Sequence, residues 1–160
     1  MIKQILFTAA LAAALAPAAV SASPETGSSA PTLALPTATG STISLSSLKG
    51  QPVYLDFFAA WCPYCNDEAS TLEALEKTYG KNVAFIAVDE EESAQVAQQF
   101  AEKYGLTYPI ALDANGSAGD AFGAEALPMN VFINRDGVVS QIQMGEMSQS
   151  QIQAALNTIS

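Results

Sequence analysis

The chain contains two cysteines, Cys62 and Cys65, and only Pro63 and Tyr64 separate them. They follow a nearly continuous apolar run over residues 53–60. A proline directly after the first cysteine suits the first position of a helix, where its missing N–H costs nothing. The pair is therefore expected where a strand gives way to a helix. Two thiols at this spacing predict a dithiol/disulfide redox couple.

The expected helix gives the two cysteines different roles. Cys62 would stand at the helix N-terminus, where free N–H groups and the helix dipole favour a thiolate and lower its pKa. Cys65 would lie one turn further along on the same helix face, so the two sulfurs can bond. We expect Cys62 to attack a partner disulfide and Cys65 to release the resulting mixed disulfide.

Other uses of the cysteine pair are open on these residues alone. A purely structural disulfide would close too short a loop to restrain the unfolded chain much. Zinc would need two more ligands, and the chain has no histidine and no further cysteine, so no metal site is predicted. Copper(I) held by two thiolates is an alternative. A cysteine–histidine nucleophile is excluded.

The first 22 residues have the pattern of a secretory signal peptide. Lys3 supplies a positive start, residues 5–16 are apolar, and Val20-Ser21-Ala22 predicts cleavage after Ala22. An uncleaved membrane anchor is the alternative, although the run is short and alanine-rich for a bilayer core of ~30 Å. Export predicts a periplasmic location, where disulfides persist. Residues 23–31 are predicted to be a flexible lead, and residues 32–160 a single domain.

The charge balance excludes some partners. The chain has six basic and sixteen acidic residues and a formal net charge of −10. Such a protein is repelled by phosphate backbones and by anionic membrane surfaces, so nucleic acid is not an expected partner. The simplest consequence of the charge is solubility.

Hydrophobic periodicity predicts an α/β domain. Strands are expected at residues 33–36, 42–45, 53–58, 83–88, 108–112, 131–133 and 138–142, and helices after Cys62, at 94–104, at 117–122 and after Ser148. Crossover helices build a parallel half and a hairpin builds an antiparallel half. The result is a mixed central sheet flanked by helices on both faces. The acidic stretch at residues 89–93 is expected at a helix start, the alternative being a patch that selects partners.

Asp56 is the one charged residue in the apolar run at residues 53–58. A lone carboxylate in a buried strand is costly unless it is paired or protonated, so burial should raise its pKa. That would suit a proton acceptor for the inner thiol. The alternative is an aspartate turned toward a solvated sheet edge.

Residues 53–65, which read VYLDFFAAWCPYC, resemble the strand–turn–helix signature of the thioredoxin superfamily. Asp56 stands six residues before the first cysteine, where thioredoxins carry a buried acid. The leading hairpin, the segment from Phe100 to Gly116 and the segment ALPMNVFINRDG at residues 126–137 are similar to the exported TlpA/ResA-like branch. The resemblance covers about residues 30–160. It implies a thioredoxin fold with an N-terminal β-hairpin and a TlpA-like insertion.

The resemblance also implies a cis Leu127–Pro128 peptide lying against the cysteine pair. A cis X–Pro bond is an energetically costly tight turn, and the segment around it can offer an unpaired edge to an extended substrate. An ordinary trans proline opening a strand is the alternative. Trp61, Pro63 and Tyr64, with Leu127 and Pro128, are the expected substrate-binding residues.

A glutamate three residues after the second cysteine tunes the thiols in this branch, and Glu68 occupies that position. Three features depart from the family pattern. The Pro-Tyr pair between the cysteines resembles glutaredoxins, Ser70 stands where a proline is usual, and Met129-Asn130 replaces the common threonine pair. These departures bear on the redox potential and on the choice of partner.

The resemblance implies a thiol:disulfide oxidoreductase that reduces exported partner proteins, such as apocytochrome c or copper-site thiols. A membrane thiol donor would re-reduce it. No cofactor beyond the Cys62–Cys65 disulfide is expected, and a monomer is expected. The alternatives are a dithiol oxidant that forms disulfides in secreted proteins, and a non-catalytic module that binds a metal or a partner.

Overall fold

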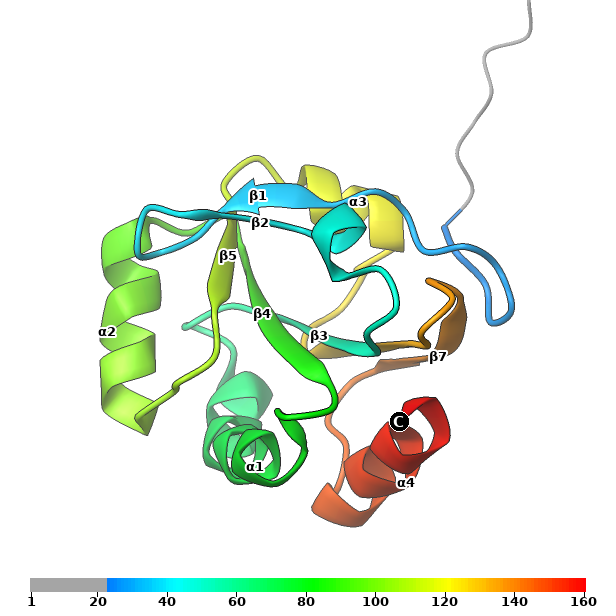
Figure 1. Cartoon of the computed structure of the whole chain (residues 1–160). Helices are drawn as coiled ribbons and strands as arrows, with labels where there is room; N and C mark the ends of the chain where they lie inside the picture. Colours follow the sequence, from blue (N-terminus) through cyan, green and yellow to red (C-terminus); the bar gives the residue numbers. More distant parts are fainter. Residues whose placement is uncertain (1–22) are drawn as a thin grey trace, which may run out of the picture.

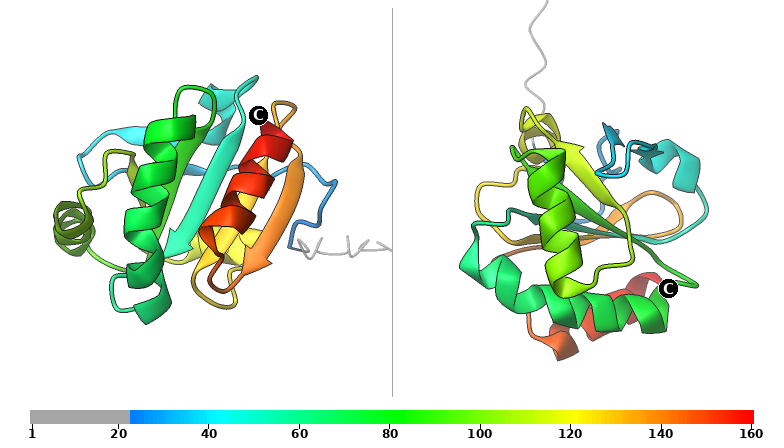
Figure 2. Two further views of the ribbon diagram at one scale, coloured as in Figure 1. Left: turned by 90° about the horizontal axis from the view of Figure 1, so that it is seen from below. Right: turned by 90° about the vertical axis from the view of Figure 1, so that its left-hand side faces the viewer.

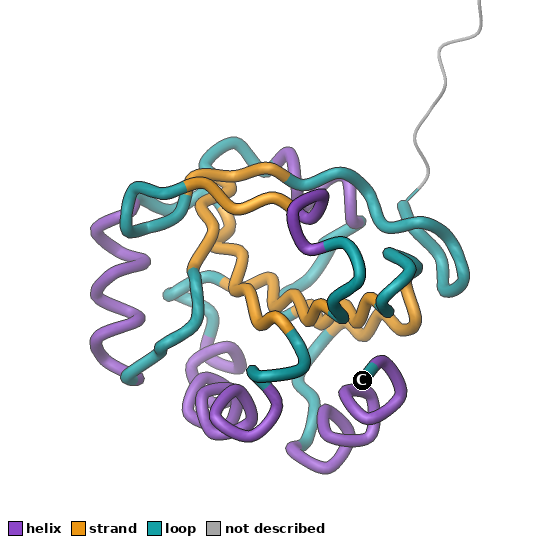
Figure 3. Tube along the Cα trace, viewed as in Figure 1, coloured by secondary structure: helices purple, strands orange, loops and turns teal. Residues whose placement is uncertain are grey.

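A computed structural model describes residues 23–160 (Figures 1 and 3). The predicted signal peptide at residues 1–22 lies outside the described residues. The strands are β1 (Ala34–Pro36), β2 (Thr42–Ser44), β3 (Val53–Phe58), β4 (Ala84–Glu90), β5 (Ile110–Asp113), β6 (Met129–Ile133) and β7 (Val139–Met144). The helices are η1 (Leu45–Leu48), α1 (Pro63–Tyr79), α2 (Ala94–Tyr104), α3 (Ser117–Phe122) and α4 (Gln149–Ile159).

The central sheet has the strand order β5-β4-β3-β6-β7. Strands β3, β4 and β5 are parallel, whereas β6 runs antiparallel to β3 and β7 antiparallel to β6. Strands β1 and β2 form a separate antiparallel hairpin. The predicted mixed sheet and leading hairpin are therefore confirmed.

Strand β3 lies in the middle of the sheet, and all six of its residues are buried. Tyr54 and Phe58 point to one face, where they pack into a core with α1, α2 and α4. Leu55 and Phe57 point to the other face and pack with α3 and the residues of the hairpin. Figure 2 shows α1 and α4 side by side over the first face. A strand covered on both faces needs the near-continuous apolar run seen in the sequence.

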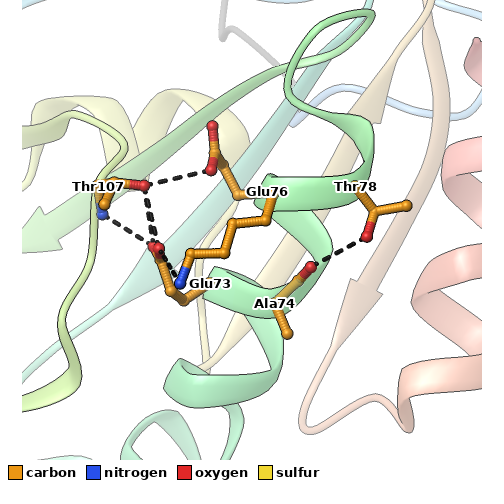
Figure 4. A network of polar contacts seen from close by, with 6 residues as sticks. Glu73, Ala74, Glu76, Thr78 and Thr107 are labelled. Atoms are coloured by element: carbon orange, nitrogen blue, oxygen red, sulfur yellow. Dashed lines mark hydrogen bonds and ion pairs between the residues drawn. The ribbon is translucent and has the colours of Figure 1, made fainter.

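Helix α1 is tied to the loop before β5 by a polar network (Figure 4). The Thr107 backbone N–H donates to Glu73 (2.8 Å), and its hydroxyl donates to Glu73 (3.1 Å) and Glu76 (3.2 Å). Lys77 forms an ion pair with the same Glu73 carboxylate (3.1 Å). The buried Glu73 charge is thus satisfied, and the distal half of α1 is held in place.

The segment before the hairpin differs from the expected flexible lead. Gly27 donates its N–H to the Val139 carbonyl (2.8 Å), and Ala30 donates to the Gly137 carbonyl (2.9 Å). Val139 in turn donates to the Ser28 carbonyl (2.9 Å). Strand β7 is an edge strand with unpaired backbone groups, and these residues cover its beginning. Residues 27–30 are therefore part of the fold.

The expected helix start at residues 89–93 is also corrected. Asp89 and Glu90 belong to β4, because their parallel pairing with Leu112 and Asp113 of β5 continues the strand past Val88. Helix α2 begins only after Ser93, whose hydroxyl caps it by accepting the Val96 N–H. Within residues 23–160, none of the helices is long and apolar enough to cross a membrane.

Candidate active site

Cys62 and Cys65 form a disulfide at the N-terminus of α1, at the end of β3 where the sequence predicts it. Cys62 is the N-cap residue, Pro63 is the first helical residue, and the two Cα atoms are 5.3 Å apart. The Cys65 N–H donates to the Cys62 sulfur (3.3 Å). A helix N–H directed at this sulfur stabilises a thiolate there once the disulfide is reduced.

Exposed aromatic side chains flank the buried disulfide. Cys62 and Cys65 are 3% and 4% exposed, whereas Trp61 is 72% and Tyr64 is 58% exposed. An exposed indole and phenol beside a reactive sulfur offer apolar contact area to an incoming polypeptide. This placement suits the substrate-binding role expected of Trp61 and Tyr64.

The Leu127–Pro128 peptide is cis, as predicted, so the trans alternative is wrong. Met129 follows at once and pairs with Phe57 of β3, which places Pro128 at the end of the sheet from which the chain enters α1. Leu127 packs against the core cluster that includes both cysteines. The Pro128 carbonyl accepts the Gly145 N–H (2.8 Å), which joins this turn to the end of β7.

Asp56 is buried on the sheet face covered by α1, so the alternative of a solvated sheet edge is wrong. It shares that face with Tyr54 and Phe58 because side chains alternate along a strand. Its Oδ1 atom has no hydrogen-bond partner among the described residues. Burial raises the pKa of Asp56 well above its ordinary value, and the nearby charge of Glu68 raises it further. A carboxyl whose pKa is raised in this way is a stronger base, which suits it to accept a proton.

Glu68 lies on the same face of α1 as Cys65, one turn further along, and it is also buried. Its Oε1 atom accepts the Met147 backbone N–H, which links α1 to the loop before α4. Burial raises the pKa of Glu68 from 4.5 to about 7. The hydrogen bond from Met147 lowers the Glu68 pKa, and the charge of exposed Glu146 raises it. The Asn130 amide also lowers the Glu68 pKa. The structure thus brings the carboxyls of Asp56 and Glu68 close together, with Glu68 on the same helix face as Cys65.

Asn130 and Tyr54 complete this buried polar group, and the sequence did not identify either as a site residue. Asn130 is directly opposite Asp56 in the β3–β6 register, and its Oδ1 atom accepts the Tyr54 hydroxyl hydrogen bond. Burial, followed by the charge of Asp56, raises the pKa of Tyr54 well above its usual value, so Tyr54 stays a neutral donor. In the sequence, the one indication of this group was Asn130 itself, an amide two positions after Pro128 where threonine is common in the family.

The arrangement contains the groups that dithiol chemistry uses. It has a sulfur at a helix N-terminus, a second sulfur one turn inside, and two buried carboxyls able to hold a proton. Within residues 23–160, no group of three or more histidine, cysteine, aspartate or glutamate residues is placed to hold a metal ion. Fold and site together define a thioredoxin-like thiol:disulfide oxidoreductase.

The comparison with known proteins agrees with that class. The chain belongs to the Redoxin family, which it matches over residues 25–158. It is similar to the thioredoxin-like protein YneN of Bacillus subtilis, at 32% identity over 136 residues that cover 83% of this chain and 79% of the relative. It is 34% identical over 134 residues to the thiol-disulfide oxidoreductase ResA of the same organism, with 83% and 75% covered.

A solved structure shows the same fold. It is that of a secreted Mycobacterium tuberculosis disulfide oxidoreductase homologous to Escherichia coli DsbE. The two chains superpose with a TM-score of 0.72 at 26% identity, covering 79% of this chain and 95% of the other. The predicted thioredoxin fold and the resemblance to the ResA-like branch are both confirmed.

Proposed function

We propose that the protein reduces disulfides in exported partner proteins, with Cys62 as the attacking thiol and Cys65 as the resolving thiol. The observation that carries the assignment of Cys62 as the attacking thiol is the hydrogen bond from the Cys65 N–H to the Cys62 sulfur at the helix N-terminus. It distinguishes two cysteines that are otherwise equally buried.

The reaction begins from the reduced dithiol. The Cys62 thiolate attacks one sulfur of the partner disulfide, a mixed disulfide forms, and the other partner sulfur leaves as a thiolate that takes up a proton. Cys65 then loses its proton to the Asp56 carboxylate, with Glu68 next to it, and attacks the Cys62 sulfur. The Cys62–partner bond breaks, and the second partner sulfur leaves as a thiolate that takes up the proton held by Asp56. The partner thus gains two electrons and two protons, one from solvent and one from Cys65 by way of Asp56, and the Cys62–Cys65 disulfide is formed.

The buried acids support the reducing direction. A negative charge on Asp56 or Glu68 behind the cysteines disfavours a second negative charge on sulfur. A reduced form that is not strongly stabilised as a thiolate gives its electrons up more readily, whereas a strongly stabilised one makes a dithiol an oxidant. The opposing observation is the helix N–H at Cys62, which favours the thiolate and hence the alternative function of a dithiol oxidant.

The partners and the location follow from the predicted signal peptide and from the relatives. One structural relative is a secreted disulfide oxidoreductase, which supports a periplasmic location for this chain. There the protein would act as a monomer. Its substrates would be disulfides in exported proteins, such as apocytochrome c or proteins whose thiols bind copper. A membrane thiol donor would re-reduce its own disulfide.

The reduction potential tests the direction. In equilibrium with glutathione buffers, a value near the thioredoxin potential of about −270 mV is expected, and one near about −120 mV would show an oxidant instead. Insulin reduction tests the role of Cys62. The wild type should be active and the Cys62→Ser variant inactive. Full activity in that variant would contradict the catalytic role of Cys62, whereas an inactive wild type would favour the non-catalytic binding module.

A further inference from the structure

The segment that joins β3 to α1 is held by polar contacts that reach it from the side of α2. Residues 60–62 carry the exposed Trp61 and the N-cap Cys62, so apolar packing alone cannot fix them. We propose that Asn66 and Glu92 are positioning residues that hold residues 60–62, and with them the Cys62 sulfur, in the geometry required for attack. This inference rests on the proposed role of Cys62 as the attacking thiol.

Asn66 uses both ends of its amide in this contact. Its Nδ2 group donates to the carbonyls of Ala60 (2.9 Å) and Cys62 (2.7 Å). Its Oδ1 atom accepts from the Tyr104 hydroxyl (2.6 Å) and from the Lys103 ammonium (3.0 Å). Its two N–H donors and both acceptor positions are thus used, so only one orientation of the amide satisfies all four contacts. The last turn of α2 is thereby linked to the backbone on both sides of Trp61.

The orientation of Tyr104 and Lys103 is itself fixed by packing. The Tyr104 ring lies 4.8 Å from that of Phe100, which in turn lies 4.6 Å from Phe58 at the end of β3. The Lys103 ammonium lies over the Tyr104 ring, 4.7 Å from its centre, a distance at which cation–π attraction operates. The donors to Asn66 are therefore held against the same strand that leads into the active site.

Glu92 reaches the segment from the other end of α2. Its carboxylate accepts the Ala60 N–H (2.5 Å). The preceding residue, Glu91, has a φ of 58°, and among residues 23–160 it is the sole non-glycine residue with a positive φ. This backbone conformation is costly for a side chain with a Cβ, and such residues concentrate at functional sites. Here it turns the chain after β4 so that Glu92 meets Ala60.

The contacts predict a specific consequence for the Cys62 thiol. A thiolate at an N-cap gains from the helix N–H groups only while its sulfur is held in front of them. Loss of the Asn66 contacts lets residues 60–62 move, so the thiolate loses part of that stabilisation and the Cys62 pKa rises. A merely structural role would lower the free energy of unfolding and leave this pKa unchanged.

The first test compares the Cys62 pKa in variants of the Asn66 contact. The pKa is read from thiolate absorbance and from the pH dependence of iodoacetamide labelling, with the site of labelling assigned by mass spectrometry. Asn66→Ala should raise it by about one unit, a tenfold loss of thiolate. Asn66→Ser should raise it less, because a serine hydroxyl can donate to the Cys62 carbonyl four residues earlier.

A double-mutant cycle tests whether Tyr104 acts through Asn66. Tyr104→Phe should raise the Cys62 pKa in the wild type and have no further effect in the Asn66→Ala background. Tyr79→Phe, which removes a hydroxyl at the far end of α1, is the matched control and should leave the Cys62 pKa unchanged. Since Tyr104→Phe removes a single hydroxyl, it provides the decisive measurement even where Asn66→Ala fails to fold.

The Glu92 contact is tested in the same way. Glu92→Gln retains an acceptor for the Ala60 N–H and should leave the Cys62 pKa within a few tenths of a unit, whereas Glu92→Ala should raise it. Glu102→Ala, the same change at an exposed position of α2, is the control. An unchanged pKa in Asn66→Ala and Glu92→Ala, with labelling still on Cys62, would overturn the positioning role alone. Preferential labelling of Cys65 in the wild type would contradict the proposed function and this inference with it.

Discussion

The raised pKa of Glu68 predicts that its charge destabilises the folded protein at alkaline pH. The Glu68→Gln substitution keeps the size of the side chain and an oxygen that can accept the Met147 N–H, and it removes the charge. Wild-type Glu68 has a pKa of about 7 when folded, against 4.5 when exposed to water. The folded state therefore binds the proton more tightly than the unfolded state does.

The sign and the size of the effect follow from linkage. Glu68 contributes its full stability below pH 4.5, where it is protonated in both states, and loses it as the pH rises through about 7. A difference of about 2.5 units corresponds to roughly 3 kcal/mol. Because solvent near the exposed Glu146 screens part of the charge, we expect about half of this, near 1.5 kcal/mol.

Urea unfolding of the oxidised protein at pH 5 and pH 8.5 measures this contribution. Glu68→Gln should unfold with nearly the wild-type free energy at pH 5 and be more stable than the wild type by about 1.5 kcal/mol at pH 8.5. The other buried acids are present in both proteins, so their pH dependence largely cancels. Glu125→Gln, the same change at an exposed position, serves as the control. Its free energy of unfolding should equal that of the wild type at both pH values.

Two results would contradict this prediction. In one, the free energies of unfolding of Glu68→Gln and the wild type differ by the same amount at pH 5 and pH 8.5. In the other, Glu68→Gln is less stable than the wild type at pH 8.5. Either result would mean that the hydrogen bond to Met147 outweighs the cost of burying the charge. It would also remove the argument that Glu68 disfavours a thiolate beside it.

Two further predictions concern the reaction itself. Limiting iodoacetamide near neutral pH should label Cys62 in preference to Cys65 in the reduced protein, because the helix N–H groups favour the Cys62 thiolate; equal labelling would contradict that argument. Asp56→Asn should slow release of the mixed disulfide by about 10²-fold and its formation much less, because only release needs a proton acceptor for Cys65. Stopped-flow traces in which Asp56→Asn slows formation more than release would exclude Asp56 from that role.

Much of the fold and half of the site could be predicted from local patterns. The apolar run in β3 and the proline after Cys62 identified the strand–helix junction, because strand burial and helix initiation depend on neighbouring residues. A charged residue in that run marked Asp56. The end of β4 was misplaced, because the acids at 89 and 90 extend the strand only through their pairing with β5. Local charge there favoured a helix start.

The remaining site residues were decided by tertiary structure. Glu92 meets Ala60 across 32 positions of the chain, Tyr54 meets Asn130 across 76, and Glu68 meets Met147 across 79. None of these contacts has a local signal, since each depends on strand register and on where a helix docks. The amino-acid sequence by itself determined that a dithiol stands at a helix N-terminus in a thioredoxin-like fold. Only the folded chain decided which carboxyls and amides surround that dithiol, because long-range packing alone brings them together.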